Sequence, residues 1–268
     1  MEYTRGALAP KVDTRDYEVR AAAGEFPSEY CVNYLPKVKN QKNVSSCVAH
    51  AMSSIIEYFI KTECDEELPM STDFIYGMQG VAFGRKESGM YLRDACKIVK
   101  DYGDAPKELV PGNTEQPKCT DELEALLSDN IYEEALINQI RSYAKCKTAN
   151  DIKHALMNYG PVLASVKWYD KYSFNNGVIS MDQNTDYGYH AIMIYGWNEQ
   201  GWLCQNSWGK TWNKDGRFIY PFGDKLEEAW SIVDAENEDV YTPKNNSWLN
   251  VVYKIINFII NAIKGMAK

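Results

Sequence analysis

The sequence is poor in the residues that build metal and redox sites. It has three histidines, and none of its seven cysteines forms a C-x-x-C pair with another. Structural zinc sites and thioredoxin-like redox sites are built from such pairs, so neither is predicted. We therefore expect no metal and no cofactor. Because the cysteine count is odd, at least one thiol must stay unpaired within a monomer.

The chain also lacks an excess of positive charge. Its 29 Lys and Arg residues against 37 Asp and Glu residues give a formal net charge of −8. A nucleic-acid backbone repels such a chain, so we predict no nucleic-acid partner. The sequence does not open with a basic segment followed by an apolar run, so we predict no signal peptide. With no transmembrane segment predicted either, we expect a cytoplasmic location, from which lysis or packaging in a particle could release the protein.

Hydrophobic periodicity predicts a different kind of secondary structure in each half of the chain. Apolar residues at three- and four-residue steps predict a helix from Val48 to Ile60, with Ser45 or Ser46 as its N-cap. Similar arguments predict helices over 91–102, 121–127 and 149–159. Short apolar runs between turn residues predict strands over 162–168, 190–197, 201–205 and 217–220. This order predicts an α+β protein with a helical N-terminal lobe and a β-rich C-terminal lobe.

The two ends of the chain differ from this central part. Residues 1–26 have no sustained period and are interpreted as an extension, which leaves 27–235 as the main domain. Residues 236–247 are acidic and then polar, and are interpreted as a linker. Residues 248–268 predict an amphipathic helix with one narrow polar stripe. We expect this helix either to pack against its own domain or to dock on another subunit, a larger assembly or an anionic membrane surface.

Cys47 is the best candidate for a nucleophile. It lies in the predicted first turn of the helix, where the positive end of the helix dipole favours the thiolate. The alternative is that Cys47 is a small buried apolar residue, as most free cysteines are. Among the histidines, His50 is interpreted as a packing residue and His154 as a solvated one. His190 opens a buried strand and could act at the mouth of a site, although a lone histidine there is more often structural.

An Asn-Ser-Trp-Gly segment begins at Asn206. An amide that an indole keeps dry can hold an imidazole in one tautomer, so Asn206 is a candidate partner for His190. The alternative is an ordinary turn, because Asn, Ser and Gly are common in turns.

Three segments together resemble the papain family of cysteine peptidases. The segment from Gln41 to Ala51 is similar to that family's nucleophile segment, with Gln41 six residues before Cys47. Tyr189-His190-Ala191 resembles its histidine segment, and Gln205-Asn206-Ser207-Trp208-Gly209 resembles its asparagine segment. The order of the segments and their separations also fit. The sequence around the cysteine resembles that of bacterial and phage-borne members more than that of lysosomal members.

The resemblance implies a two-lobed papain-like fold with the active-site cleft between the lobes, formed by residues 27–235. It implies a cysteine endopeptidase that acts through a Cys-His-Asn triad and a thioester acyl-enzyme. Cys47 would be the nucleophile, His190 the general base, Asn206 its orienting partner and Gln41 an oxyanion donor. The partner would be a peptide or protein substrate. By the same resemblance, five further residues are candidates for substrate binding, namely Gly89, Tyr91, Ser165, Tyr189 and Trp208.

The sequence departs from the family's pattern before and after the nucleophile. Ser45 and Val48 stand where a glycine and a tryptophan are usual, which puts the turnover rate in doubt but removes no catalytic atom. Residues 1–26 are also too few for the family's long helical propeptide. Either the enzyme is made active, or residues 1–25 lie across the cleft as a short plug.

Two other functions remain open at this stage. The first is a hydrolase of cell-wall peptides, although such enzymes usually have Cys and His closer together in the sequence. The second is a catalytically weak or inactive scaffold or binding module. The presence of Gln41, Cys47, His190 and Asn206 together argues against that alternative.

Overall fold

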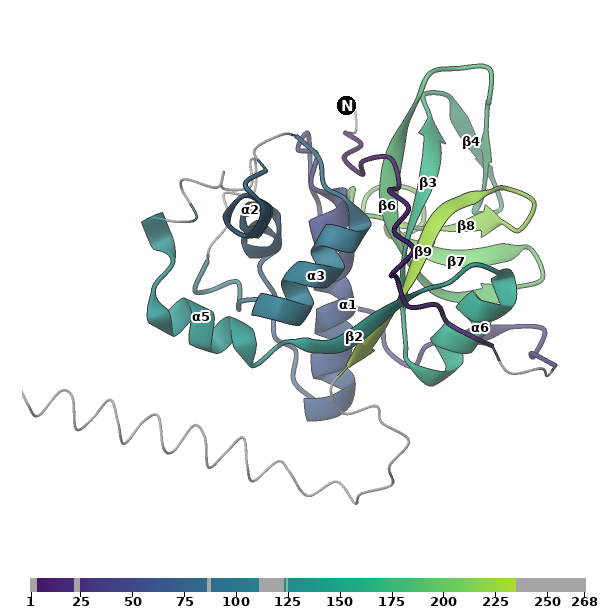
Figure 1. The fold of residues 1–268 in the computed structure, drawn as a ribbon. Helices are drawn as coiled ribbons and strands as arrows, with labels where there is room; N and C mark the ends of the chain where they lie inside the picture. The colour runs from purple at the N-terminus through teal and green to yellow at the C-terminus, as the bar shows by residue number, and fades with distance from the viewer. Residues whose placement is uncertain (1–3, 22–24, 86–87, 111–122, 124, 235–268) are drawn as a thin grey trace, which may run out of the picture. The chain divides into compact units, whose positions relative to one another are not determined.

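The computed structural model describes residues 4–21, 25–85, 88–110, 123 and 125–234 (Figure 1). All of these belong to one compact unit, Met1–Ala235. The predicted linker and C-terminal helix lie outside the described residues, as do residues 121, 122 and 124 of the helix predicted over 121–127; Leu123, Ala125 and Leu126 are helical. Among the described helices, none is long and apolar enough to cross a membrane.

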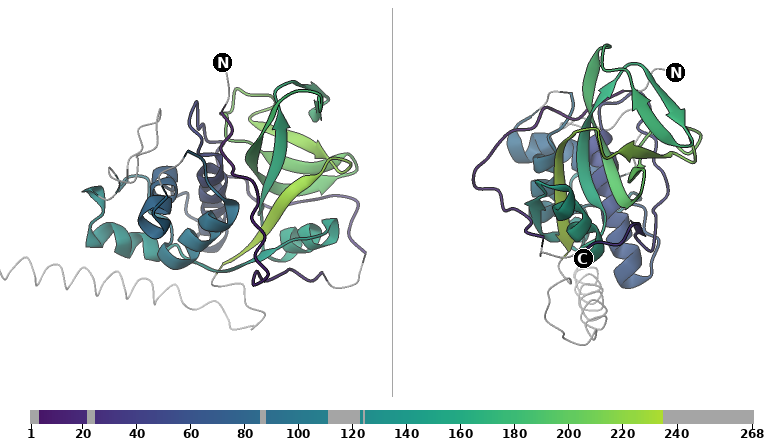
Figure 2. Two further views of the ribbon diagram at one scale, coloured as in Figure 1. Left: turned by 45° about the horizontal axis from the view of Figure 1, so that its top comes forward. Right: turned by 90° about the vertical axis from the view of Figure 1, so that its right-hand side faces the viewer.

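Helices dominate the first half of the described chain. They are α1 (Cys47–Cys64), α2 (Thr72–Phe83), α3 (Leu92–Tyr102), α5 (Asp129–Leu136) and α6 (Ala149–Asn158). The helix α1 contacts α2 and α3 and also the sheet (Figures 1 and 2). It begins after Ser46, and it ends at Asp65, which adopts a left-handed conformation with φ of 57°. At α6, Thr148 and Asp151 form a capping box.

Strands dominate the second half. They are β1 (Tyr30–Cys31), β2 (Ile140–Lys145), β3 (Val162–Tyr169), β4 (Tyr172–Asn175), β5 (Val178–Met181), β6 (Tyr187–Asn198), β7 (Gly201–Gln205), β8 (Arg217–Pro221) and β9 (Leu226–Asp234). Within the described residues they form one sheet in the order β2-β9-β3-β6-β7-β8-β5-β4, with β1 paired to β6. Most neighbours are antiparallel, and β5 and β8 pair in parallel.

The strand β6 separates two apolar cores. Its alternate residues Ala191 and Met193 belong to a core shared with the helices, whereas Ile192 and Ile194 belong to a core within the β lobe. Both faces of the strand are therefore buried, which explains its nearly continuous apolar sequence. The predicted α+β architecture of a helical lobe and a β-rich lobe is confirmed (Figure 2).

Two details of the sequence prediction need correction. The strand β6 begins at Tyr187, so His190 lies inside the strand and does not open it. The strand β6 pairs with β3 from Val162 to Tyr169, and Tyr169 lies opposite Tyr187. The backbone pairing therefore begins before the apolar run, 190–197, from which the strand was predicted. The helix α2 was not predicted. It contains Gly77 and Gly80 and is apolar around most of its circumference, so it shows no clear stripe.

Candidate active site

Cys47 is the first residue of α1, and its side chain is fully buried. The start of α1 lies against β6, where the backbone N–H of Ala191 donates to the Cys47 Sγ over 3.4 Å. The residue next to Ala191 is His190. The fold therefore brings the predicted nucleophile and the predicted base together from positions far apart in the sequence.

Gln41 is held beside the Asn-Ser-Trp-Gly segment by backbone pairing. The Gln41 N–H donates to the carbonyl oxygen of Ser207 over 2.8 Å, and the Gly209 N–H donates to that of Lys39 over 2.9 Å. The Gln41 Oε1 also accepts a hydrogen bond of 2.5 Å from the Ser207 hydroxyl. Because the Oε1 of the Gln41 amide faces Ser207, the Nε2 of the same amide points away from it and can donate to a carbonyl oxygen.

His190 and Asn206 form a short, buried hydrogen bond. The distance from His190 Nε2 to Asn206 Oδ1 is 2.7 Å, and both side chains are almost fully buried. The same Oδ1 accepts from the Ser207 N–H over 2.7 Å, which fixes it as the oxygen. An amide oxygen only accepts, so the proton of the neutral imidazole must be on Nε2. The Nδ1 of His190 is then a free lone pair, and no described residue bonds to it.

Tryptophans surround this hydrogen bond. The ring centroid of His190 lies 4.6 Å from that of Trp208 and 5.2 Å from that of Trp168. Trp168 also contacts Trp208 and Trp212. These side chains are nearly inaccessible to water. Water therefore cannot compete for the His190–Asn206 bond, which strengthens it. Trp168 was not among the sequence-predicted residues, because nothing in its local sequence distinguishes it from a core residue of β3.

Burial keeps both reactive groups neutral in this structure. It raises the pKa of Cys47 to about 11, against the opposing effect of backbone N–H groups that include those of Ala191, Gly6 and Ala7. Burial also lowers the pKa of His190 to about 4, against the hydrogen bond to Asn206. The positive charge of Arg5 lowers it further. At neutral pH the structure thus holds a thiol beside a neutral imidazole.

The N-terminal extension causes this burial, because it lies across the two lobes at Cys47. The Ala7 N–H donates to the Tyr189 carbonyl oxygen over 3.1 Å. On the other side, the Met90 N–H donates to the Gly6 carbonyl oxygen over 2.8 Å, and the Leu8 N–H donates to the Met90 carbonyl oxygen over 2.9 Å. Figure 1 shows the start of the chain beside β6.

The same segment occupies the side-chain amide of Gln41. The Gln41 Nε2 donates to the Thr4 carbonyl oxygen over 2.9 Å, and the Trp208 Nε1 donates to that oxygen over 3.3 Å. We refer to Thr4–Leu8 as the cleft segment. A peptide carbonyl of the chain itself therefore sits on the predicted oxyanion donor.

The rest of the extension is anchored on the body of the protein. Arg93 on α3 pairs with Asp13 over 2.9 Å and with Asp16 over 2.6 Å. Further along, the backbone at Tyr17 and Val19 hydrogen-bonds to Lys145, the last residue of β2. The sequence left open whether the enzyme is made active or residues 1–25 lie across the cleft. In the structure, residues from this range lie across the site.

The predicted substrate-binding residues lie around the cleft segment to different degrees. The Tyr189 carbonyl and the Trp208 indole contact it directly, as described above. A Cβ atom on Gly89 would approach the Gly6 carbonyl oxygen to 2.9 Å, so this glycine permits close contact. Tyr91 caps α3, with its ring under Lys11. Ser165 is fully buried. Met90, which was not predicted, pairs with the cleft segment through its backbone N–H and carbonyl oxygen. Such backbone bonds leave no signal in the sequence.

The other two histidines take no part in this site. The His50 Nδ1 lies 2.9 Å from the Ser46 carbonyl oxygen, and burial lowers the pKa of His50 to about 3. His154 stacks edge-on against Tyr159 on α6. Among the described residues, no group of three or more His, Cys, Asp or Glu side chains could hold a metal ion.

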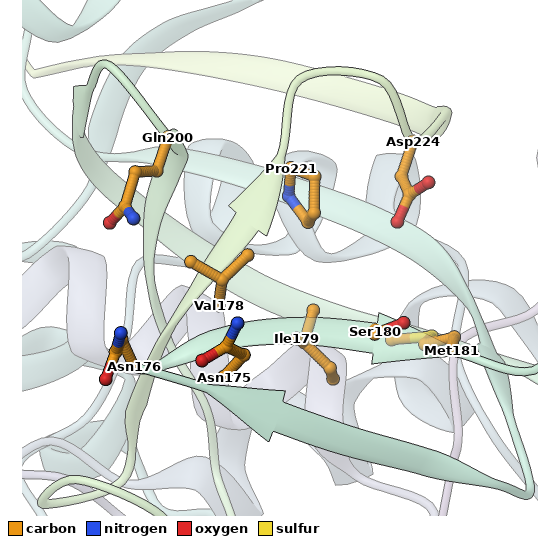
Figure 3. A pocket seen from close by; sticks show the side chains of 9 residues that line it. All are labelled: Asn175, Asn176, Val178, Ile179, Ser180, Met181, Gln200, Pro221 and Asp224. Atoms are coloured by element: carbon orange, nitrogen blue, oxygen red, sulfur yellow. The ribbon is translucent and has the colours of Figure 1, made fainter.

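A pocket of about 480 Å³ lies elsewhere, on the β4–β5 hairpin (Figure 3). Its walls are mainly amide and apolar side chains, and neither a cysteine nor a histidine lines it. It is lined by Asn175, Asn176, Val178, Ile179, Ser180, Met181, Gln200, Pro221 and Asp224. None of the sequence-predicted site residues is among them.

Solved structures share this fold. Xylellain, a cysteine protease from Xylella fastidiosa, superposes with a TM-score of 0.75 at 22% sequence identity, over 87% of this chain and 96% of that chain. The proCathepsin B S9 of Trypanosoma congolense superposes with a TM-score of 0.68 at 18% identity, over 86% of each chain. These likenesses establish the papain-like, two-lobed α+β fold that the sequence resemblance implied.

Sequence comparison identifies the family. Cathepsin B-like cysteine proteinase 3 of Caenorhabditis elegans is 24% identical over 241 residues, which is 81% of this chain and 64% of the relative. Mouse cathepsin K is 24% identical over 68% of this chain and 55% of its own length. The chain thus spans less than two thirds of these relatives. The sequence profile described as papain family cysteine protease matches residues 28–229. This match covers most of the sequence, and the chain therefore belongs to the papain family of cysteine proteases.

Proposed function

We propose that this protein is a cysteine endopeptidase that cleaves peptide bonds with Cys47, His190 and Asn206. One observation carries the proposal: the His190 imidazole, held through Nε2 by Asn206 at 2.7 Å, lies next to the residue whose N–H contacts the Cys47 sulfur. The imidazole lone pair on Nδ1 is left to take the thiol proton. In this arrangement a thiolate and an imidazolium form when the site opens to water.

The reaction then proceeds in two stages. The Cys47 thiolate attacks the carbonyl carbon of the scissile peptide bond, and the carbonyl oxygen becomes an oxyanion. His190 gives its Nδ1 proton to the leaving amine as the C–N bond breaks, which leaves a thioester on Cys47. A water molecule then gives a proton to His190 and attacks the thioester carbonyl. The C–S bond breaks, the carboxylic acid product leaves, and the Cys47 thiolate is regenerated beside the His190 imidazolium, which holds the proton from water.

Two donors stabilise the oxyanion in this proposal. They are the Nε2 of Gln41 and the backbone N–H of Cys47 at the start of α1. The support for Gln41 is that its Nε2 already donates to a peptide carbonyl, that of Thr4. The Thr4 oxygen stands where the carbonyl oxygen of a substrate would bind.

We further propose that the cleft segment inhibits the enzyme. It blocks the sulfur with the backbone at Gly6 and Ala7, and it runs in the direction opposite to a productive substrate. The leaving amine of a substrate must lie on the His190 side, so the C-terminal part of the substrate lies there. In the cleft segment it is the N-terminal residue, Thr4, that lies by Trp208 on that side, while Leu8 lies by Met90. The segment can therefore occupy the site without being cut.

An occupied cleft would also be compatible with an inactive scaffold. The reactivity of Cys47 towards iodoacetamide distinguishes the peptidase from such a scaffold. We expect alkylation of Cys47 to become faster near neutral pH than that of the exposed Cys31 once the cleft segment is displaced. Peptide mapping after labelling identifies the modified cysteine. Reactivity of Cys47 no greater than that of Cys31 in an opened chain would support the scaffold.

Substitutions at the supporting residues should have graded effects. Gln41→Ala removes one oxyanion donor and should lower kcat by about 10²–10³. Asn206→Ala should be less severe than His190→Ala, because Asn206 orients the imidazole and transfers no proton. Steady-state kinetics on a fluorogenic peptide measures these effects, with thermal melting to check folding. An Asn206→Ala enzyme that is well folded and as inactive as the Cys47→Ala variant contradicts the role given to Asn206.

The C-terminal segment supports a separate proposal, made from its sequence alone. We propose that residues 248–268 dock on another subunit, a larger assembly or an anionic membrane surface. A chain truncated after Asn246 should then stay monomeric, fully active and as stable as the full chain. A sharp fall in the melting temperature of the isolated monomer would mean that the segment packs on its own domain. The cytoplasmic location also stays a prediction from the sequence.

A further inference from the structure

Arg5 of the cleft segment is bound by the β lobe through specific polar contacts. Its Nη1 donates to the Trp168 carbonyl oxygen over 2.8 Å and pairs with the Asp170 Oδ1 over 2.6 Å. The side chains of Arg5 and Asp170 are 28% and 50% exposed, so the pair lies at the rim of the site and not in the core. A guanidinium thus finds both a carboxylate and a backbone carbonyl at this position.

Gly188 on β6 leaves the space that the Arg5 side chain fills. A Cβ atom built on Gly188 would lie 3.1 Å from the Arg5 Nε and 3.3 Å from its Cδ. These contacts are tighter than ordinary van der Waals contacts, so any larger residue would push the arginine away. Because position 188 has no side chain, Arg5 can lie over the strand and reach Asp170, and we call the space that it fills the groove over Gly188.

This groove lies on the leaving-group side of the nucleophile. Trp168, whose carbonyl oxygen binds Arg5, packs its ring against His190. The preceding residue, Thr4, binds Trp208 on the same side. His190 must protonate the leaving amine, so the part of a substrate that follows the cleaved bond passes this groove. A second exposed aspartate, Asp186, is a neighbour of Asp170, because the Asp170 N–H donates to the Asp186 carbonyl oxygen.

We propose that the Trp168 carbonyl, the Asp170 carboxylate and the groove over Gly188 form a subsite for a lysine or arginine side chain in the leaving-group part of the substrate. In the closed chain, Arg5 occupies this subsite in place of the substrate residue. The inference rests on the proposed peptidase function and adds a substrate class to it: peptides that are basic just after the cleaved bond. The net charge of −8 favours the approach of such substrates.

The test uses full-length Gly6→Val protein, in which the added side chain displaces the cleft segment. Peptides that differ only in one residue after the cleaved bond, Lys or Arg against Gln or Glu, are compared by kcat/KM. We expect the basic peptides to be cleaved about two- to fivefold faster, a modest factor because the ion pair is half exposed to water. Asp170→Asn should remove this preference, so that the Lys and Arg peptides are cleaved no faster than the Gln peptide. Asp170→Lys should make the Glu peptide the better substrate.

Glu199→Gln is the matched control. It removes the same charge from an exposed position just past the other end of β6, and it should leave the preference intact. A preference for basic residues that survives Asp170→Asn, or no preference in the parent chain, overturns the subsite. If Glu199→Gln removes the preference as fully as Asp170→Asn does, the effect comes from net charge, and the subsite is again overturned.

Binding to a chain that cannot react separates this inference from the peptidase function. Fluorescence anisotropy measures the affinity of the same labelled peptides for the Gly6→Val/Cys47→Ala protein, with and without Asp170→Asn. Tighter binding of basic peptides that depends on Asp170, without any cleavage by the Gly6→Val parent, supports the subsite and contradicts the proposed function. Cleavage by the parent, combined with equal binding of basic and neutral peptides, retains the peptidase and overturns the subsite.

Discussion

Replacing Gly6 by valine should activate the protein. A Cβ atom on Gly6 would lie 2.2 Å from the backbone carbon and oxygen of Ser45, which is far inside the contact distance. Because Ser45 belongs to the backbone turn before α1, it cannot move aside easily, and the cleft segment must leave. Such overpacking typically costs about 1–3 kcal/mol, which shifts the balance between closed and open chains by about 5- to 150-fold. The rate of peptide hydrolysis should rise by a similar factor.

Ala9→Val is the matched control for this activation. It places a valine at an exposed position just after the cleft segment, and it should leave the rate near that of the wild type. Alkylation gives a second readout. Because the pKa of the buried Cys47 is raised to about 11, the thiolate fraction at pH 7 is on the order of one in ten thousand, so labelling of the wild type should rise steeply towards alkaline pH. The Gly6→Val protein should already be labelled at neutral pH. Equal labelling and hydrolysis in both proteins would rule out inhibition by the segment.

Cys47→Ala and His190→Ala should each abolish peptide cleavage in the Gly6→Val background. The first removes the only atom that can form the thioester, and the second removes the group that moves the proton. We expect a loss of at least about 10³ in kcat for each, as for other nucleophile–base pairs.

Folding controls make this loss interpretable. Both side chains are buried, so thermal melting must confirm that each variant is folded. Because the interior imidazole of His190 is large, His190→Gln is a second variant that keeps more of its volume. Measurable turnover by purified, folded Cys47→Ala protein contradicts the mechanism.

The residues of the site could be predicted from the sequence because short segments carry them. Gln41 lies just before a turn, and Cys47 begins the helix that follows that turn. Asn206 opens a compact turn whose backbone pairs with residues 39–41, and this pairing positions it. The helix that begins at Cys47 has an apolar period, and the strand that contains His190 has a nearly continuous apolar run. Local patterns therefore predicted the two elements, and the resemblance to the papain family singled out the four candidate residues, whose roles stay a prediction.

The contents of the cleft could not be predicted in the same way. The cleft segment has no apolar period, and the backbone hydrogen bonds that hold it at Tyr189 and Met90 leave no mark in the sequence. The same reason explains why Met90 was missed between two predicted neighbours, Gly89 and Tyr91. Strands such as β2 and β9 were missed because charged residues interrupt their apolar runs, so they lack the local signal that β3 and β6 have.

The most direct test of the central claim is to trap the acyl group on Cys47. Gly6→Val protein is mixed with a peptide ester and quenched in acid within the first turnover, and intact-protein and peptide mass spectrometry locates the added mass. We expect the mass of the acyl portion on the peptide that contains Cys47, and its absence in the Cys47→Ala protein. Turnover of the ester with no adduct on Cys47, or with the adduct on another residue, would contradict the assignment of Cys47 as the nucleophile.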